Sequence, residues 1–386
     1  MPDGETTTVQ VVGSIHDIPA DEWDACAGTD NPFLSHAFFA ALEDSGSACA
    51  KTGWLPRHLL VAGKDGRAAG CAPLYLKSHS YGEYVFDWGW GEAFQRAGGR
   101  YYPKLQAAVP FTPVTGRRLL VRPDAPAGTA EALGAAMIEL ARQLGVSSLH
   151  VTFHTEAEAL LFTRLGFLPR IGQQYHWRNE GYGSFEDFLR RLSSRKRKAV
   201  RRERAEAASH GMRIRALGGG EIEPRHWDAF HRFYLDTVER KWAHAYLSRD
   251  FFTRLGETMA EKVLLIVAED GDGEPVAGAL NLIGSEALYG RYWGSAADFR
   301  FLHFEACYYR AIDFAIARGL ARVEAGAQGA HKIQRGYLPV ATYSAHWIAE
   351  PGFRKAVARF LEAERPAMEA EIEQLCEGSP FRRDGC

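Results

Sequence analysis

Residues 290–347 read GRYWGSAADFRFLHFEACYYRAIDFAIARGLARVEAGAQGAHKIQRGYLPVATYSAHW, and this stretch decides the fold. Apolar side chains recur in it at the i, i+3, i+4, i+7, i+8 spacing of one helix face: Phe304, Cys307, Tyr308, Ala311, Ile312 and Ala315. Gly319 ends this predicted helix, a strand is expected over 320–325, and a glycine-rich loop follows at 326–330. The stretch therefore predicts strand, helix, strand and loop, with polar groups where the second strand ends.

Length and composition limit the class of protein. With 386 residues, 46% hydrophobic and 24% charged, the chain is expected to be a globular protein of two domains. The formal net charge of −2 gives no overall attraction to nucleic acid or to an anionic membrane. We expect a cytoplasmic protein, because no apolar run approaches the ~20 residues of a transmembrane segment and no signal-peptide pattern is present. The six cysteines have no metal-binding spacing, so we expect free thiols and no metal site.

Landmarks recur in the same order in the two halves of the sequence. Residues 166–169 (GFLP) precede the His-Trp pair 176–177, and residues 336–339 (GYLP) precede the His-Trp pair 346–347. The two copies of each landmark are separated by the same 170 residues. A tandem duplication explains this repetition better than chance does.

Each copy is expected to form one α/β domain with a mixed central sheet flanked by helices. The predicted domains are 1–179 and 180–386, since glycines interrupt the pattern just after residue 179. An aromatic strand is expected over 83–88 in the first domain, and a long basic helix over 185–209 opens the second.

Four stretches carry a resemblance to a known family: 31–35 (NPFLS), 102–106 (YPKLQ), 109–114 (VPFTPV) and 291–339. The element order resembles the GNAT acyltransferase fold, and its doubling resembles the FemAB-like tandem-GNAT proteins, relatives of the aminoacyl transferases that build peptidoglycan bridges. The chain is most similar to the bacterial branch of N-acyltransferases described as peptidoglycan biosynthesis/recognition proteins. The resemblance covers nearly the whole chain and implies two tandem GNAT-like domains.

The same resemblance implies a transferase that uses acyl-CoA or aminoacyl-tRNA as co-substrate, without a tightly bound cofactor. The acceptor would be an amine, on a small molecule or on a lipid-linked envelope precursor, and tRNA would be a possible partner. The Q/R-x-x-G-x-G/A loop that holds the CoA pyrophosphate in GNAT enzymes is absent after Trp293, where the chain reads GSAADFRFLHFE. The resemblance therefore leaves both donors open.

Two residues are candidates for the base that amide-forming transfer requires. Glu324 lies in the predicted strand 320–325, where a carboxylate is costly unless it is used or paired. His331 follows the glycine-rich loop and has the pKa range of a general base. The alternatives are an ion pair of Glu324 with Arg322 and a structural role for His331 as a helix cap.

Five further residues are expected to bind substrate. Lys332 and Arg335 would share one face of a helical turn and hold a phosphate or carboxylate, unless they form a solvated basic face. Tyr292 and Trp293 would line a pocket or lie in the core. Glu305 would bind substrate or only complement the dipole of its helix.

The segment 190–204 contains the strongest concentration of positive charge, with nine lysines and arginines. Arg197, Arg201 and Arg202 represent this basic patch, which could bind an RNA backbone, a diphosphate lipid or a nucleotide. An apolar stripe in the same segment predicts a packed helix rather than a disordered tail. The alternative is a solvated face balanced by Glu203 and Glu206.

Two functions from different classes follow. The first is an N-acyltransferase whose second domain carries the site, while the first supplies a wall of the acceptor cleft. The second is a catalytically degenerate GNAT-fold protein that holds RNA or an anionic envelope precursor through its basic helix.

An aromatic cluster of the first domain is expected to form core or to line that acceptor cleft: Trp88, Trp90, Tyr101, Tyr102 and Lys104.

Overall fold

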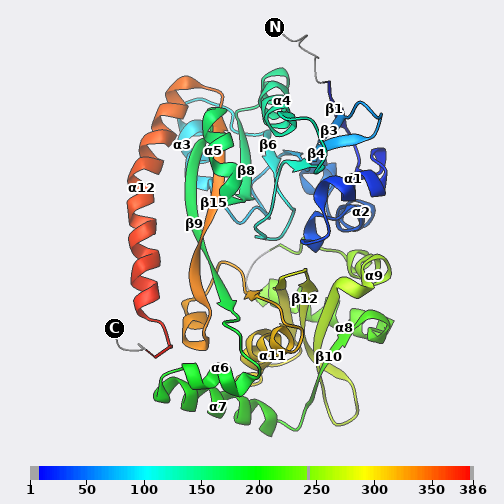
Figure 1. The fold of residues 1–386 in the computed structure, drawn as a ribbon, viewed down its shortest axis with the longest axis vertical. Helices are drawn as coiled ribbons and strands as arrows, with labels where there is room; N and C mark the ends of the chain where they lie inside the picture. The colour runs from blue at the N-terminus through cyan, green and yellow to red at the C-terminus, as the bar shows by residue number, and fades with distance from the viewer. Residues whose placement is uncertain (1–7, 241–243, 383–386) are drawn as a thin grey trace. The chain divides into compact units, whose positions relative to one another are not determined.

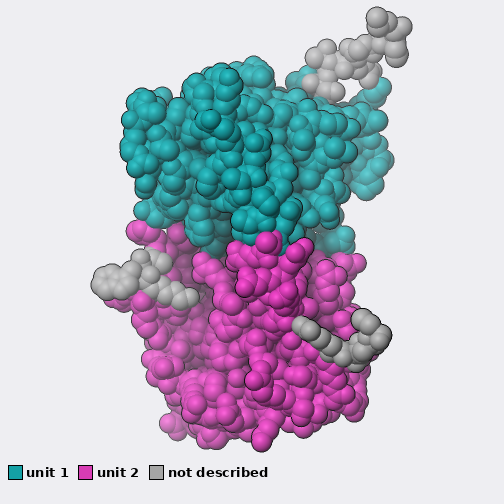
Figure 2. All heavy atoms as spheres, turned by 90° about the vertical axis from the view of Figure 1, so that its left-hand side faces the viewer, with its two compact units in different colours: residues 1–172, 341–369 teal, residues 173–340, 370–386 magenta. Residues whose placement is uncertain are grey.

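The chain forms two compact units in the computed structural model, which describes residues 8–240 and 244–382. Figure 2 colours the units separately. They consist of residues 1–172 with 341–369 (unit 1) and of residues 173–340 with 370–386 (unit 2). The expected α/β class is confirmed, because each unit contains a sheet and several helices (Figure 1).

The units divide the chain differently from the predicted halves 1–179 and 180–386. The chain enters unit 2 within a few residues of the predicted boundary, but residues 341–369 return to unit 1. Unit 1 is therefore built from both ends of the sequence. The boundary at residue 179 stays a prediction about the repeat.

Unit 1 contains two sheets. The first has the order β15-β8-β6-β5-β2, and β6 runs parallel to β8 while the other pairs are antiparallel. Its strands are β2 (Trp54–Pro56), β5 (Tyr75–Lys77), β6 (Lys104–Ala107), β8 (Ser148–His154) and β15 (Leu338–Ile348, from residue 341 onward). The second sheet is antiparallel, in the order β1 (Val9–Val12), β3 (His58–Ala62), β4 (Ala68–Ala72) and β7 (Leu120–Val121).

Helix α4 (Thr129–Gln143) anchors the core of unit 1. Its Leu133 and Met137 are buried with Leu149 and Val151 of β8, at the i, i+4 spacing that places both on one helix face. The remaining helices are α1 (Ala20–Ala27), α2 (His36–Asp44), α3 (Trp88–Arg96), α5 (Glu156–Arg164) and the first part of α12 (Pro351–Glu377). Short 3-10 turns lie at Ile15–Asp17, Pro32–Leu34 and Ala50–Thr52.

Unit 2 has one mixed sheet in the order β10-β11-β12-β13-β14-β9. The only parallel pair among these strands in the described residues is β13 with β14, as expected for a strand–helix–strand crossover. The strands are β9 (Leu168–Arg178, from residue 173 onward), β10 (Arg213–Gly218), β11 (Val263–Glu269), β12 (Pro275–Ile283), β13 (Ala287–Ser295) and β14 (Arg322–Glu324).

Helices cover both faces of this sheet (Figure 1). Phe230 of α8 packs over Gly278 of β12, while Ile312 of α11 is buried with Ala279 and Leu288, whose side chains point to the other face. The helices are α6 (Phe185–Arg191), α7 (Ser194–Ser209), α8 (Pro224–Arg240), α9 (Arg249–Thr258), α10 (Leu302–Phe304), a π-helical turn (Glu305–Tyr309) and α11 (Arg310–Ala317). Short 3-10 turns lie at Gly219–Glu221, Ala260–Lys262 and Ala330–Arg335.

Two expectations about elements are wrong. The aromatic strand at 83–88 does not form, because Tyr84 adopts a left-handed backbone with φ of 60° and helix α3 starts at Trp88. The basic helix at 185–209 is two helices, since Leu192 is extended with ψ of 150°. No helix among the described residues is both long and apolar enough to cross a membrane.

Candidate active site

Strands β13 and β14 pair over only three residues and then part. Ala287–Tyr289 faces Arg322–Glu324 in parallel register, after which β14 ends while β13 continues to Ser295. Arg291 is an extra residue in β13, because Leu280 faces Tyr292 and Asn281 faces Gly290. A bulge of this kind bends a strand and redirects its side chains. Beyond Tyr289, no strand of the described chain pairs with this edge of β13.

Neighbouring residues at the end of β13 point to opposite faces of the sheet. Tyr292 packs edge-on against Tyr234 of α8, with ring centroids 5.6 Å apart. Trp293 faces the other way and contacts His303, with ring centroids 5.3 Å apart. The structure therefore does not bring the predicted substrate-binding pair together: Tyr292 packs against α8, and Trp293 belongs to a second cluster.

An aromatic and imidazole cluster surrounds Trp293 where the strands diverge. His303 contacts the ring of Tyr308 at 5.3 Å, and the Tyr308 hydroxyl lies 3.0 Å from Nε2 of His331. Tyr308 is supplied by the π-helical turn, an irregularity that often occurs at functional sites. The imidazole of His331 is exposed, so this cluster reaches the surface of the protein.

The surroundings of His331 keep its imidazole neutral. Partial burial lowers its pKa, and the nearby cations Arg335 and Lys332 lower it further. Burial raises the pKa of the Tyr308 phenol, which therefore stays protonated. A neutral imidazole next to a protonated hydroxyl is a suitable arrangement for a general base.

Glu324, the other predicted base, is enclosed by cationic groups. Its Oε1 accepts a hydrogen bond from Nε of Arg322 at 3.1 Å, which is the ion pair considered as an alternative. Its Oε2 lies 3.6 Å from a terminal nitrogen of Arg291 and 3.9 Å from Nε2 of His176. With a side chain only 2% exposed, Glu324 ties β14 to its neighbours on both sides.

Lys332 and Arg335 are both used within unit 2. Arg335 donates to Glu203 through two nitrogens, at 2.8 and 3.1 Å, and its guanidinium stacks 3.4 Å above the ring of Phe304. Lys332 donates to the carbonyl oxygen of Ala325 at 2.5 Å. Both side chains are buried, so the geometry does not favour the expected grip on an external anion.

Glu305 is buried at the start of the π-helical turn. Its Oε1 accepts hydrogen bonds from Arg204 at 3.0 Å and from Arg310 at 2.9 Å, and Arg204 also bonds to Asp313 at 2.7 Å. These ion pairs attach α7 to the helix that carries Tyr308. The structure therefore gives Glu305 partners beyond the helix dipole.

Helix α7 presents part of the basic patch to solvent. Arg201 and Arg202 are exposed and Arg197 is half-buried, and Arg201 pairs with Glu186. Glu203 does not balance this surface as expected, because it points inward and bonds to Arg335 and to the hydroxyl of Tyr309. The outer face of α7 is therefore more cationic than its sequence indicates.

Each unit has a pair of titratable residues that face each other on neighbouring antiparallel strands. In unit 2, Glu324 of β14 faces His176 of β9. In unit 1, His150 of β8 faces His346 of β15, with their Nδ1 atoms 2.7 Å apart. Each pair lies where a parallel pair of strands meets, β13 with β14 and β6 with β8. The duplication is thus visible in the chemistry as well as in the fold.

Unit 1 contains a buried ionic network that the sequence analysis missed. Lys104 is fully buried and donates to Ser80 and Glu83, each at 2.7 Å, and to Asp87. Burial raises the pKa of Glu83 to about 7. The Tyr101 hydroxyl donates to Asp87 at 2.6 Å, which places the network next to the histidine pair.

Only part of this network had a sequence signal. The sequence singles out Lys104 as part of an aromatic cluster. In the structure Trp90 and Tyr101 of that cluster are buried, while Trp88 is 37% exposed. Asp87 and Glu83 lie inside the segment 83–88 that the sequence predicts to be a strand. Among the described residues, no group of three or more His, Cys, Asp or Glu could hold a metal ion.

One parallel pair of strands within a mixed sheet, joined by a helical crossover, occurs in each unit, and in unit 2 the strand β13 also carries a bulge. This arrangement, present twice, defines the class: a tandem GNAT fold. The chain belongs to the FemAB-like family, described as peptidoglycan biosynthesis/recognition, whose sequence profile matches residues 14–383. The expected family, fold and transferase class are therefore confirmed. No curated protein sequence matches the chain.

Solved structures with the same fold differ strongly in sequence. The crystal structure of FemX has a TM-score of 0.56 and 13% identity, covering 88% of this chain and 98% of that one. The C-terminal domain of a lysylphosphatidylglycerol synthetase from Agrobacterium fabrum has a TM-score of 0.55 and 10% identity, covering 89% and 95%. L-PGS from Bacillus licheniformis has a TM-score of 0.52 and 12% identity, covering 87% and 98%.

Proposed function

We propose that this FemAB-like transferase moves an acyl or aminoacyl group from acyl-CoA or aminoacyl-tRNA to an amine. The acceptor would be a peptidoglycan precursor, small or lipid-linked, and the reaction would take place in the cytoplasm. The divergence of β13 and β14 beside the Trp293–His331 cluster carries this proposal. The activated acyl group would enter between the diverging strands, next to the part of β13 that follows Tyr289.

His331 would take the proton of the attacking amine. If Nε2 carries the imidazole proton, it donates to the Tyr308 hydroxyl, and Nδ1 keeps a lone pair for the amine. The amine nitrogen then bonds to the acyl carbon, and the bond to the thiol or to the tRNA hydroxyl breaks. The leaving group takes up a proton, so that charge balances. Backbone N–H groups of β13 beyond its pairing with β14 would stabilise the developing oxyanion.

Glu324 would position β14 rather than act as the base. Arg322 and Arg291 lie next to its carboxylate, and the side chain is enclosed within the sheet. His331 is exposed and has no carboxylate partner among its described contacts. Exposure and a neutral lone pair favour His331 for contact with an incoming amine.

The proposal is tested by product formation. Purified protein is incubated with acyl-CoA or charged tRNA and candidate amines, and amides are detected by mass spectrometry. We expect His331→Ala to lower kcat/KM about 10²- to 10³-fold, and Tyr308→Phe to lower it about tenfold. The exposed His210 provides a matched control, because His210→Ala should retain activity. Full activity of His331→Ala with any productive pair of substrates would rule out this base.

The exposed cations of α7 favour a second candidate function, the binding of RNA. In that case the protein would bind tRNA without forming product, and affinity would fall steeply with salt. Arg201→Glu with Arg202→Glu would abolish the binding. Product formation that is unaffected by this double substitution would assign the patch no part in donor binding.

A further inference from the structure

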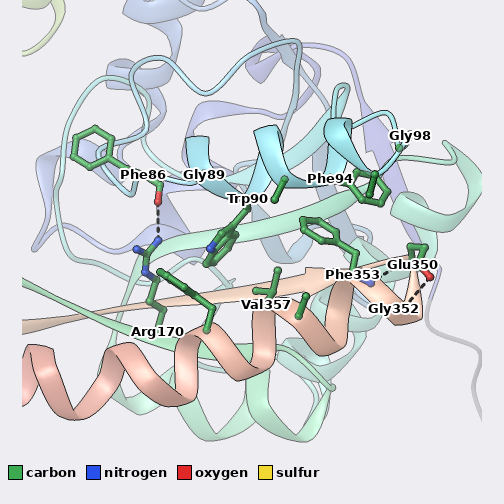
Figure 3. Close-up of a pocket in the computed structure, with 15 residues that line it drawn as sticks. Phe86, Gly89, Trp90, Phe94, Gly98, Arg170, Glu350, Gly352, Phe353 and Val357 are labelled. Atoms are coloured by element: carbon green, nitrogen blue, oxygen red, sulfur yellow. Dashed lines mark hydrogen bonds between the residues drawn. The ribbon is translucent and has the colours of Figure 1, made fainter.

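Helices α3 and α12 of unit 1 enclose a groove of about 790 Å³ (Figure 3). Aromatic rings form much of its wall: Phe86, Trp90, Phe94, Phe353 and Phe360. This volume lies within the range of about 300–1,000 Å³ that is typical of small-molecule sites. The residues proposed for acyl transfer all belong to unit 2, so the groove is a separate feature.

Small residues keep the middle of the groove open. Gly89 and Ala93 lie on one face of α3 at a spacing of four residues, Ala97 follows directly after the helix, and Gly352 and Ala356 have the same spacing on α12. The rings of Phe94 and Phe353 stack 4.4 Å apart between the helices (Figure 3). The space lies between two helices and is bounded by aromatic rings and small side chains, which suits a flexible apolar chain.

The polar groups of the wall are already bonded within the protein. Arg170 donates to Glu364 through two nitrogens at 2.7 Å and to the carbonyl oxygen of Phe86 at 2.8 Å. Glu350 accepts from the backbone N–H groups of Gly352 and Phe353 at the start of α12. A sugar, nucleotide or peptide would lose its hydrogen bonds to water here without replacement, whereas a hydrocarbon would lose none.

Positive charge accompanies the apolar wall on α12. Residues 351–361 read PGFRKAVARFL, with three cations and no carboxylate. Lys355 and Arg359 are exposed and directly precede the groove residues Ala356 and Phe360. Phe360 is itself 47% exposed, which is a high value for a large apolar side chain away from an interaction site.

We propose that this groove binds one hydrocarbon chain of a phosphate-bearing amphiphile. The chain would lie between α3 and α12, and the phosphate would bind Lys355 and Arg359 at the edge of α12. Burial of each methylene favours binding, and the two cations select an anionic headgroup. The inference concerns binding alone and does not depend on the proposed transfer reaction.

Titration calorimetry on the full chain tests the proposal, with dodecyl phosphate below its micelle concentration as the probe. Dodecanol tests the chain without the phosphate, and inorganic phosphate tests the phosphate without the chain. We expect dodecyl phosphate to bind about tenfold or more tightly than dodecanol, and inorganic phosphate not to compete. Ala356→Trp should fill the groove and lower affinity about tenfold or more. Ala367→Trp, on an exposed position of α12 outside the groove, should bind as the wild type does.

The headgroup is tested by Lys355→Glu with Arg359→Glu, which should weaken dodecyl phosphate and leave dodecanol unchanged. Equal weakening by Ala356→Trp and Ala367→Trp, or no binding by the wild type, would overturn the proposal. So would a dimer, detected by light scattering, that Ala356→Trp converts to a monomer, because the groove would then bind a second copy. Thermal unfolding of each variant shows whether a loss of binding is a loss of fold.

Discussion

At the scale of single residues, the histidine pair of unit 1 is buried beside the ionic network of Lys104. His150 and His346 are each 1% exposed, and Oδ2 of Asp87 lies 3.7 Å from Nε2 of His150. Ser148 and Ser344 bond to the outer nitrogens of the two rings, at 2.8 and 3.0 Å. Such contacts satisfy two neutral imidazoles but do not stabilise two charged ones.

The pair predicts a loss of stability in acid. Burial lowers the pKa of His150 to about 3 and that of His346 well below its ordinary value. The unfolded chain therefore binds more protons than the folded chain below about pH 6.5, and stability falls as pH falls from there towards 3. Each imidazole contributes up to about 1.4 kcal/mol per pH unit to this slope.

Urea unfolding between about pH 6.5 and 4.5 measures that slope. His346→Asn keeps a polar partner for His150 but removes one titrating group. The slope of the free energy of unfolding against pH should then decrease by about 1.4 kcal/mol per pH unit. A variant with the slope of the wild type would show that His346 is not held neutral in the folded protein.

Sequence patterns single out some of the residues of the candidate site but do not show the partners of others. His331 and Trp293 were expected at the site because they follow a glycine-rich loop and end a strand, and both features are local. Arg335 was expected to bind substrate, but its partner Glu203 lies 132 residues away along the chain. His150 lies in an apolar strand and meets His346 across 196 residues. Pairings over such distances have no local signal.

At the scale of elements, helix α8 approaches the sheet closely where two glycines face each other. Gly278 of β12 pairs with Gly294 of β13, and α8 lies over both. A Cβ at Gly294 would lie 2.3 Å from the backbone oxygen of Phe233. Neither strand nor helix can relieve this clash by a side-chain rotation. Because neither glycine has a side chain, α8 can lie this close to β13, the strand that carries Trp293.

We expect Gly294→Ala to lower the free energy of unfolding by about 3 kcal/mol, because the helix must move away from the sheet. Denaturant unfolding measures the effect. Gly271→Ala, in the turn between β11 and β12, is the control, since a Cβ there meets nothing within 4 Å. Equal stability of the two variants would contradict the packing seen here.

Secondary structure was predicted correctly where apolar residues keep a helical spacing over several turns. The apolar spacing from Phe304 to Ala315 predicted a helix, and the structure has helix or π-helical turn from Leu302 to Ala317. The π-helical turn itself had no signal, because one extra residue in a turn alters hydrogen bonding without altering composition. The strand prediction for 83–88 is wrong because it rests on aromatic content, which is typical of strands, whereas Tyr84 has a left-handed backbone with φ of 60°.

At the scale of the whole molecule, unit 1 is not continuous in sequence. Strand β15 supplies His346 and Ala345 to its sheet, and α12 supplies Phe353 and Val357 to the cluster around Trp90. The sequence repeat correctly indicated two copies of one fold. It could not show that residues 341–369 join unit 1, because the order of the landmarks is the same whichever unit these residues pack in. The first 179 residues therefore lack part of the core of unit 1.

A chain that ends at residue 179 should consequently fail to fold cooperatively. It leaves β8 without its antiparallel partner β15 and exposes the apolar surface that α12 covers in unit 1.

The two cut ends lie close together in the intact unit, since a Cβ at Gly172 would be 3.1 Å from Oγ1 of Thr342. A short glycine-serine linker from residue 172 to residue 341 should therefore restore a cooperative transition in a chain that ends at residue 369. Near-ultraviolet circular dichroism during thermal unfolding distinguishes the two chains. If the 1–179 chain alone unfolds with a sharp transition, residues 341–369 are an addition to unit 1 and not part of its core.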